Sequence, residues 1–306
     1  MSRIWLISLV VACAIGMAFW LVPQGQPDVP TAEAARTDMS ATVTAAPEAV
    51  GPRPVLHRVA SGRGTVRDDF ETSADLFVYA QRVSLLARGG DADAHWMLSR
   101  VYDYCGGYAA NPVAYDSDTR AIAALDVSAA PAMAAARERV SRRCARFTPA
   151  DGLTASVVQE TRMRAALAGS LPAEAALLAD GVPMSEADGY RRELVERVVA
   201  SGDPQAFLAL STAMGLSASG DEAELGDVSG TWLSELAWQV AACRLGLDCR
   251  AQGNLMTAYC AYGGICSRDP SQDFPTFVLD GGVPRQGAEQ LDNMVDSLLS
   301  RRRVLK

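Results

Sequence analysis

The distribution of the seven cysteines around one apolar segment constrains this chain most. Ile4–Val22 is a run of 19 residues without a charged side chain, and it contains Cys13. A helix of that length covers roughly the 30 Å hydrocarbon core of a bilayer. The other six cysteines all follow this run: Cys105, Cys144, Cys243, Cys249, Cys260 and Cys266. Because disulfides form in oxidising compartments, the pattern predicts an exported, membrane-tethered and disulfide-bonded domain.

The charge next to the apolar run predicts its orientation. Arg3 is the only charge close to its start, so residues 1–3 are expected in the cytoplasm and residues 4–22 are expected to cross a bacterial inner membrane once. The rest of the chain is then expected in the periplasm. Two alternatives stay open: a signal peptide cleaved near residues 32–34, which would give a secreted protein, and a lipoprotein lipidated at Cys13.

The chain after the apolar run divides into a stalk and a domain. Residues 23–66 hold six prolines among small and polar residues, with few large apolar side chains, which is typical of a disordered stalk. In residues 67–306 apolar residues recur at helical spacing, and no sustained alternation indicates a strand. One such stripe consists of Leu291, Met294, Val295, Leu298 and Leu299. The sequence therefore predicts an all-α domain.

One ten-residue word occurs twice in this domain. Gly90–Ser99 aligns without a gap on Gly202–Ser211, sharing Gly, Asp, Ala, Leu and Ser at equivalent positions. The glycine is expected to end one helix in a left-handed conformation, and the aspartate is expected to cap the next. Pro204 follows at the first helical position. Each copy predicts a helix-turn-helix corner, and residues 169–181 form a degenerate third copy.

Extended from Ala87 to Tyr102, the first copy reads A-x-x-G-D-x-x-A-x-x-x-L-x-x-x-Y. This word resembles the Sel1-like subclass of tetratricopeptide-type helical repeats. The resemblance implies an irregular array of antiparallel helical hairpins, here stapled by disulfides. It also implies a scaffold that binds a protein or peptide partner in the cell envelope.

Two segments share a cysteine word, C-x-x-G-x-x-C, at residues 243–249 and 260–266. Six residues of helix would separate the two Cα atoms by about 9 Å, beyond the roughly 7 Å limit for a disulfide. A local bond therefore requires the helix to stop, which Gly246 and Gly263 would allow. A crossed pairing between the segments and a zinc site held by these thiols are the alternatives. The preferred pairs are Cys243 with Cys249, Cys260 with Cys266, and Cys105 with Cys144.

No catalytic residue, metal ligand or cofactor is predicted. The chain has two histidines, His57 in the stalk and His95 in a helix, and it lacks the familiar nucleophile, phosphate-loop and zinc-hydrolase motifs. A net charge of -8 argues against nucleic acid as a partner. An envelope enzyme acting on polysaccharide or peptidoglycan through unidentified carboxylates is the alternative to a binding scaffold.

A tyrosine-rich segment is the predicted recognition surface. Tyr104, Tyr108 and Tyr115 surround Gly106-Gly107 and Cys105, in a stretch expected to form a loop. Tyrosine offers a broad contact area with a polar tip, which suits protein binding. The alternative is that these rings pack in the core and cover a disulfide.

Overall fold

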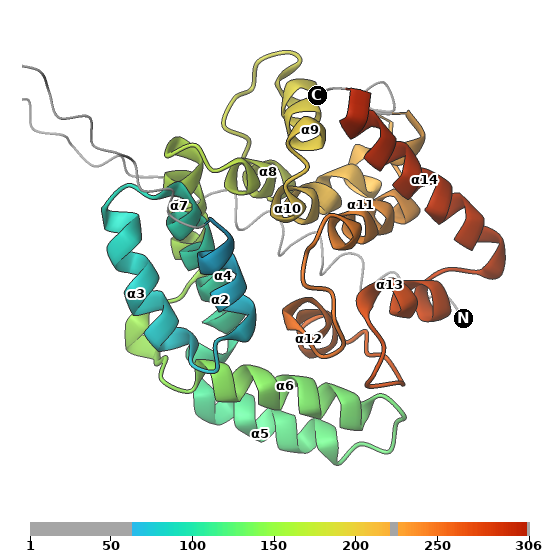
Figure 1. Cartoon of the computed structure of the whole chain (residues 1–306). Helices are drawn as coiled ribbons and strands as arrows, with labels where there is room; N and C mark the ends of the chain where they lie inside the picture. The colour runs from blue at the N-terminus through green and yellow to red at the C-terminus, as the bar shows by residue number, and fades with distance from the viewer. Residues whose placement is uncertain (1–62, 221–225, 305–306) are drawn as a thin grey trace, which may run out of the picture. The chain divides into compact units, whose positions relative to one another are not determined.

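The computed structural model describes residues 63–220 and 226–304, and this part of the chain contains helices and turns without a strand (Figure 1). The predicted all-α class is confirmed for these residues. The expectations for residues 1–3 and 4–22 and for most of the stalk lie outside them. None of the described helices combines the length and hydropathy needed to cross a bilayer.

The first half of the described chain contains seven α-helices: α2 (Arg63–Thr72), α3 (Leu76–Arg88), α4 (Ala92–Ala109), α5 (Pro112–Ala123), α6 (Ala130–Cys144), α7 (Ala155–Leu167) and α8 (Leu171–Ala179). Helical structure thus begins inside the stretch expected to be a stalk. A row of packed neighbours runs from α3 through α4 and α7 to α8. The helices α5 and α6 form a hairpin beside this row (Figure 1).

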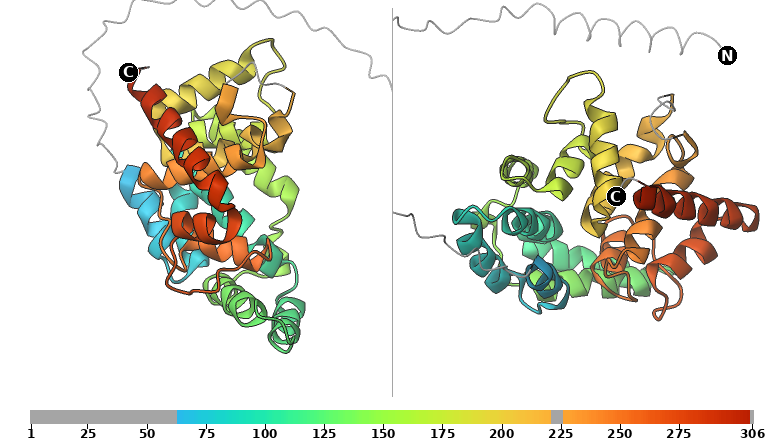
Figure 2. Two further views of the ribbon diagram at one scale, coloured as in Figure 1. Left: turned by 90° about the vertical axis from the view of Figure 1, so that its right-hand side faces the viewer. Right: turned by 45° about the horizontal axis from the view of Figure 1, so that its top comes forward.

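The second half adds six α-helices: α9 (Tyr190–Ser201), α10 (Pro204–Met214), α11 (Trp232–Arg244), α12 (Asn254–Ala261), α13 (Phe274–Phe277) and α14 (Arg285–Val304). The row continues from α8 through α10 and α11 to α14. In Figure 2, α14 lies alongside α11 and near α9. The short helix α12 packs against α6, which brings the second half of the chain onto the α5–α6 hairpin beside the row.

Both predicted helix corners are confirmed. Gly90 and Gly202 adopt left-handed conformations with φ of +86° and +60°. Asp91 and Asp203 then cap α4 and α10, each accepting a backbone N–H of its helix at 2.8 and 2.9 Å. Pro204 occupies the first turn of α10. Glycine supplies a conformation that costs other residues energy, and the carboxylate satisfies an otherwise unpaired donor.

The two corners lead to different packing. The helices of the first corner, α3 and α4, are close neighbours, as expected for a hairpin. The helices of the second corner, α9 and α10, contact each other much less, because α10 is sandwiched between α8 and α11. The degenerate copy also forms a corner: Gly169 is left-handed between α7 and α8, but Ser170 makes no capping hydrogen bond.

Two cores hold the helices together, and α8, α10 and α12 each contribute to both, α10 through Ala209. The helix α8 places Ala175 in the C-terminal core and Leu177 in the N-terminal core. The helix α12 places Met256 in the C-terminal core and Cys260 in the N-terminal core. Each of these helices therefore buries apolar side chains in both cores, and this burial holds the two halves of the domain together.

The preferred disulfide pairing is confirmed. Cα–Cα distances are 5.5 Å for Cys105–Cys144, 5.6 Å for Cys243–Cys249 and 4.4 Å for Cys260–Cys266. The first bond joins α4 to α6, and the other two close turns at the ends of α11 and α12. The crossed pairing is therefore not the observed one, and the four sulfur atoms of the two cysteine words are not available to a zinc ion.

The glycines that end α11 and α12 agree only in part with the sequence prediction. Gly246 is left-handed with φ of +105°, as predicted, but in the second word the left-handed residue is Gly264 rather than Gly263. Gly263 is required for another reason. A Cβ atom at this position would lie 2.8 Å from the backbone oxygen of Tyr259, so only glycine lets the chain fold back over α12.

Candidate functional site

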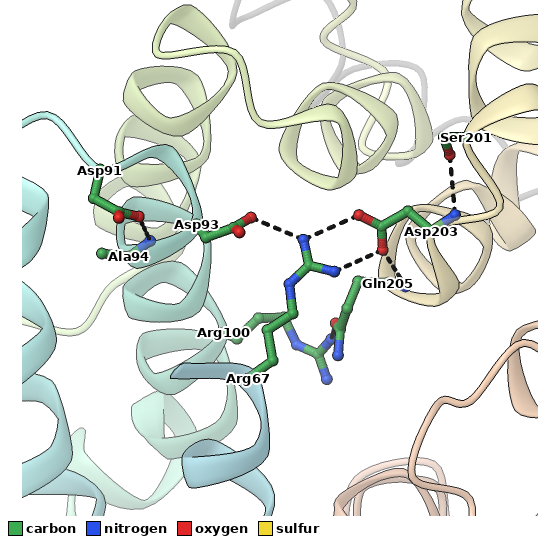
Figure 3. Close-up of polar contacts among 8 residues, drawn as sticks. All are labelled: Arg67, Asp91, Asp93, Ala94, Arg100, Ser201, Asp203 and Gln205. Atoms are coloured by element: carbon green, nitrogen blue, oxygen red, sulfur yellow. Dashed lines mark hydrogen bonds and ion pairs between the residues drawn. The ribbon is translucent and has the colours of Figure 1, made fainter. Parts of the chain in front are cut away.

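Arg67 of α2 connects the two copies of the repeated word (Figure 3). Its Nη1 and Nη2 donate to the two carboxylate oxygens of Asp203 at 2.8 and 3.0 Å, and Nη2 also donates to Asp93 at 2.8 Å. Burial lowers the pKa of Arg67, but hydrogen bonds and the charges of both aspartates outweigh burial and raise it. This ion-pair cluster holds α2 against the first turns of α4 and α10.

Beside this cluster lies a cavity of about 460 Å³, named here the Glu71 pocket, between α2, the start of α10 and residues 246–250. Glu71 Oε2 is buried and has no hydrogen-bond partner among the described residues. Burial raises the pKa of Glu71 to about 6, and the charges of Arg100 and Arg143 oppose this shift. Asp248, which lines the same cavity, adds to the rise.

A second cavity, of about 330 Å³, is named the arginine pocket because Arg139, Arg142 and Arg143 of α6 line it. Arg143 is held by the backbone oxygens of Phe70 and Ser73 and by the side chain of Asn254. It therefore anchors the segment after α2 to the start of α12. Arg142 is exposed.

Arg139 is the partly buried guanidinium of this pocket that makes a single hydrogen bond among the described residues. Its Nε donates to Thr257 Oγ1 at 3.0 Å, and its two Nη groups have no assigned partner in the part of the chain that the structure describes. Within the described chain no carboxylate forms an ion pair with Arg139, Arg142 or Arg143. Burial and then the neighbouring charge of Arg142 lower the pKa of Arg139. An anion placed here would offset both effects.

A third cavity, of about 520 Å³, is named the apolar pocket and lies between the start of α6, α12 and residues 266–272. Small and apolar groups dominate its lining: Pro131, Ala132, Ala135, Met256, Pro270 and the Cys260–Cys266 disulfide. Arg139 and Arg268 also line it. Its volume lies within the range of roughly 300 to 1,000 Å³ that is usual for ligand pockets.

The three cavities adjoin one another in the order Glu71 pocket, arginine pocket and apolar pocket. Glu71, Thr72 and Arg250 line both the Glu71 pocket and the arginine pocket. Arg139 and Gln252 line both the arginine pocket and the apolar pocket. We call the three adjoining pockets together the groove. Glu71 lies where the Glu71 pocket meets the arginine pocket, the three α6 arginines line the middle, and mainly apolar side chains line the other end.

The three tyrosines predicted as a binding surface are buried. Tyr104, Tyr108 and Tyr115 expose 8%, 7% and 6% of their surface. The rings of Tyr108 and Tyr115 pack edge to face with centroids 5.5 Å apart, and Tyr104 packs on Tyr262, which is 44% exposed. Of the three, Tyr104 lines the arginine pocket. Binding through Tyr108 and Tyr115 stays a prediction, although their side chains offer little accessible surface.

The expected tyrosine loop is helical instead. Gly106 and Gly107 lie within α4, which continues to Ala109. Gly106 is required by packing, since a Cβ atom there would lie 2.8 Å from the backbone oxygen of Leu153. The glycine pair thus marks a close contact between two backbones rather than a break in the helix.

Comparisons with protein-family models, curated proteins and solved structures found no match for this chain. The resemblance to Sel1-like repeats therefore stays a prediction from the repeated word alone. Among residues 63–220 and 226–304, no three His, Cys, Asp or Glu side chains are grouped so as to hold a metal ion.

Sequence reasoning missed the arginines of α6, although a signal was present. Arg139, Arg142 and Arg143 are spaced i, i+3 and i+4, which places them on one face of a helix. Nothing in the sequence near them shows that Asn254 and Thr257 lie opposite, because those residues are more than a hundred positions away.

Proposed function

We propose that this domain binds an extended, acidic peptide segment of a partner protein in the groove. The observation that carries the proposal is the set of three α6 arginines that line one pocket and form no ion pair with a carboxylate among residues 63–220 and 226–304, although Glu71 lines the same pocket. Planar guanidinium groups match carboxylates in geometry and charge. A series of adjoining pockets suits a ligand with several side chains better than it suits one small molecule.

The setting we propose is the bacterial periplasm, with residues 4–22 as the inner-membrane anchor. The uncharged run and the three disulfides support this placement, since such bonds persist in oxidising compartments. A scaffold related to Sel1-like helical repeats remains part of the proposal, supported by the glycine-aspartate corners. Secretion after cleavage and lipidation at Cys13 are the alternative placements.

The binding test uses the full chain and short fluorescent peptides in an anisotropy titration. One peptide alternates Glu with Leu, and its counterpart alternates Lys with Leu. We expect the acidic peptide to bind and the basic one to fail. Arg142→Glu should weaken binding at least about tenfold, because it replaces an exposed attraction with a repulsion. Arg120→Glu is the matched control, since Arg120 is exposed on α5 and lines none of the three pockets.

Equal binding of the two peptides, or an Arg142→Glu protein that behaves like the Arg120→Glu protein, would show that the arginine pocket is not the site. Binding of peptidoglycan fragments in place of peptides would also contradict the proposal.

A second candidate function is hydrolysis of an envelope polysaccharide. One specific observation favours it: Glu71 and Asp248 line a single pocket, and a carboxyl group with a pKa of about 6 suits a general acid. Release of soluble fragments from dye-labelled peptidoglycan by the wild type, lost in Glu71→Gln, would favour this candidate over the peptide-binding one.

A further inference from the structure

Arg139 lies at the junction of two chemically different pockets. It lines the arginine pocket and the apolar pocket, and neither of its Nη groups has an assigned partner within residues 63–220 and 226–304. One ligand residue can therefore contact both the Arg139 guanidinium and the apolar pocket. This juxtaposition restricts what kind of acidic group can use both at once.

An internal Asp or Glu of an extended peptide fits this arrangement less directly than a terminal residue does. Successive side chains of an extended chain point to opposite sides, and the next side chain on the same side lies roughly 6 to 7 Å along the chain. A C-terminal residue is different, because its carboxylate and its side chain leave the same Cα atom. Capture of a terminal carboxylate beside a side-chain pocket is an established mode of peptide recognition.

The backbone at the junction supports a built site. Gln252 lines both pockets and is the one non-glycine residue with positive φ, +58°, among the described residues. Its side-chain nitrogen donates to the backbone oxygen of Pro270 at 3.2 Å, and its backbone oxygen accepts from Thr257 at 3.1 Å. Strained residues of this kind persist where the surrounding structure fixes them, and they cluster at binding sites.

We propose that the groove binds the C-terminus of its partner, with the terminal carboxylate on Arg139 and an apolar last side chain in the apolar pocket. This inference rests on the proposed function and adds the identity and direction of the bound segment. Upstream acidic residues of the ligand then pass Arg142 and Arg143. Arg268 and Asp269 both line the apolar pocket, so their opposite charges offset each other and Arg139 is the group expected to hold the terminal carboxylate.

The test compares three labelled peptides that share one acidic sequence ending in Leu. The first has a free C-terminus, the second is amidated, and the third ends in Lys instead of Leu. Anisotropy titrations with the full chain should show at least about tenfold weaker binding for the second and the third. In Arg139→Gln the free and amidated peptides should bind alike, because the carboxylate has lost its partner.

Two further variants separate recognition from folding. Ala135→Trp should fill the apolar pocket and weaken the Leu peptide, while α6 keeps its buried face because Ala135 is exposed. Gln252→Gly removes the side chain at the junction and its hydrogen bond to Pro270, while glycine adopts the positive φ without strain, so it should weaken binding of the free acid with a net change in stability of less than about 1 kcal/mol. Equal affinity of the free and amidated peptides for the wild type would overturn the C-terminal inference and leave the peptide groove standing. Failure of all three peptides to bind would overturn both proposals.

Discussion

Replacing Glu71 by Gln should stabilise the protein at neutral pH. The carboxylate lies at the junction of the Glu71 pocket and the arginine pocket, and one of its oxygens is buried without a hydrogen-bond partner. Burial raises its pKa from 4.5 to about 6, although Arg100 and Arg143 favour the charged form. Burial therefore outweighs these attractions, and the charge destabilises the folded state.

The magnitude and its pH dependence follow from the pKa shift. The rise from 4.5 to about 6 corresponds to about 2 kcal/mol at pH values above both. Because the folded state holds the proton more tightly, the wild type gains this stability as the pH falls from about 7 to 4.5. Glu71→Gln is neutral at every pH, so its advantage should be about 2 kcal/mol at pH 7.5 and close to zero near pH 4.

Urea unfolding followed by far-ultraviolet circular dichroism, with the disulfides intact, measures this difference. In a separate thermal unfolding experiment at pH 7.5, the melting temperature of Glu71→Gln should lie about 4 to 8 °C above that of the wild type for a domain of this size. Glu138→Gln is the matched control, because Glu138 is exposed on α6 and should change stability by less than about 0.5 kcal/mol. A Glu71→Gln protein that is less stable than the wild type at pH 7.5 would refute the reasoning, since Arg100 and Arg143 would then dominate over burial.

Two further substitutions test the packing of the helices. Arg67→Met should cost about 3 kcal/mol or more in urea unfolding, because Asp203 loses its bidentate partner in a largely buried place; unchanged stability would mean that the cluster does not hold α2. Gly106→Ala should cost about 1 to 3 kcal/mol, because its Cβ would lie 2.8 Å from the backbone oxygen of Leu153. Gly107→Ala, whose Cβ meets a tyrosine ring at 3.4 Å, should be neutral or gain up to about 1 kcal/mol of helix propensity. Equal effects at the two glycines would contradict the close contact with Leu153.

The part of the fold that the sequence predicted correctly depends on residues near each other in the chain. The glycine and aspartate of each corner act on adjacent turns, so the corners at Gly90 and Gly202 could be placed from the repeated word. The bonds Cys243–Cys249 and Cys260–Cys266 followed from spacing, because six residues of helix hold two cysteines too far apart and a glycine lies between them.

The role of a glycine could not be predicted from the sequence where it depended on contact with a backbone segment distant in the chain. Gly106 was interpreted as a sign of a loop, because glycine is poor in helices and common in turns. The structure places it inside α4, where the absence of a side chain lets Leu153 approach. The tyrosines around it were interpreted as a surface because tyrosine offers a broad contact area with a polar tip, and the packing of α4 on α5 and α6 buried them instead.

The sequence by itself determined the helical class, the two capped corners and the short-range disulfides, because periodicity, capping and chain geometry act within a few residues. Only the tertiary structure determined which residues come together to line the groove. Arg139 meets Thr257 across 118 positions and Arg143 meets Asn254 across 111, and both contacts exist because α12 turns back onto α6. No local pattern encodes that return, since it results from apolar surfaces of distant helices being buried together.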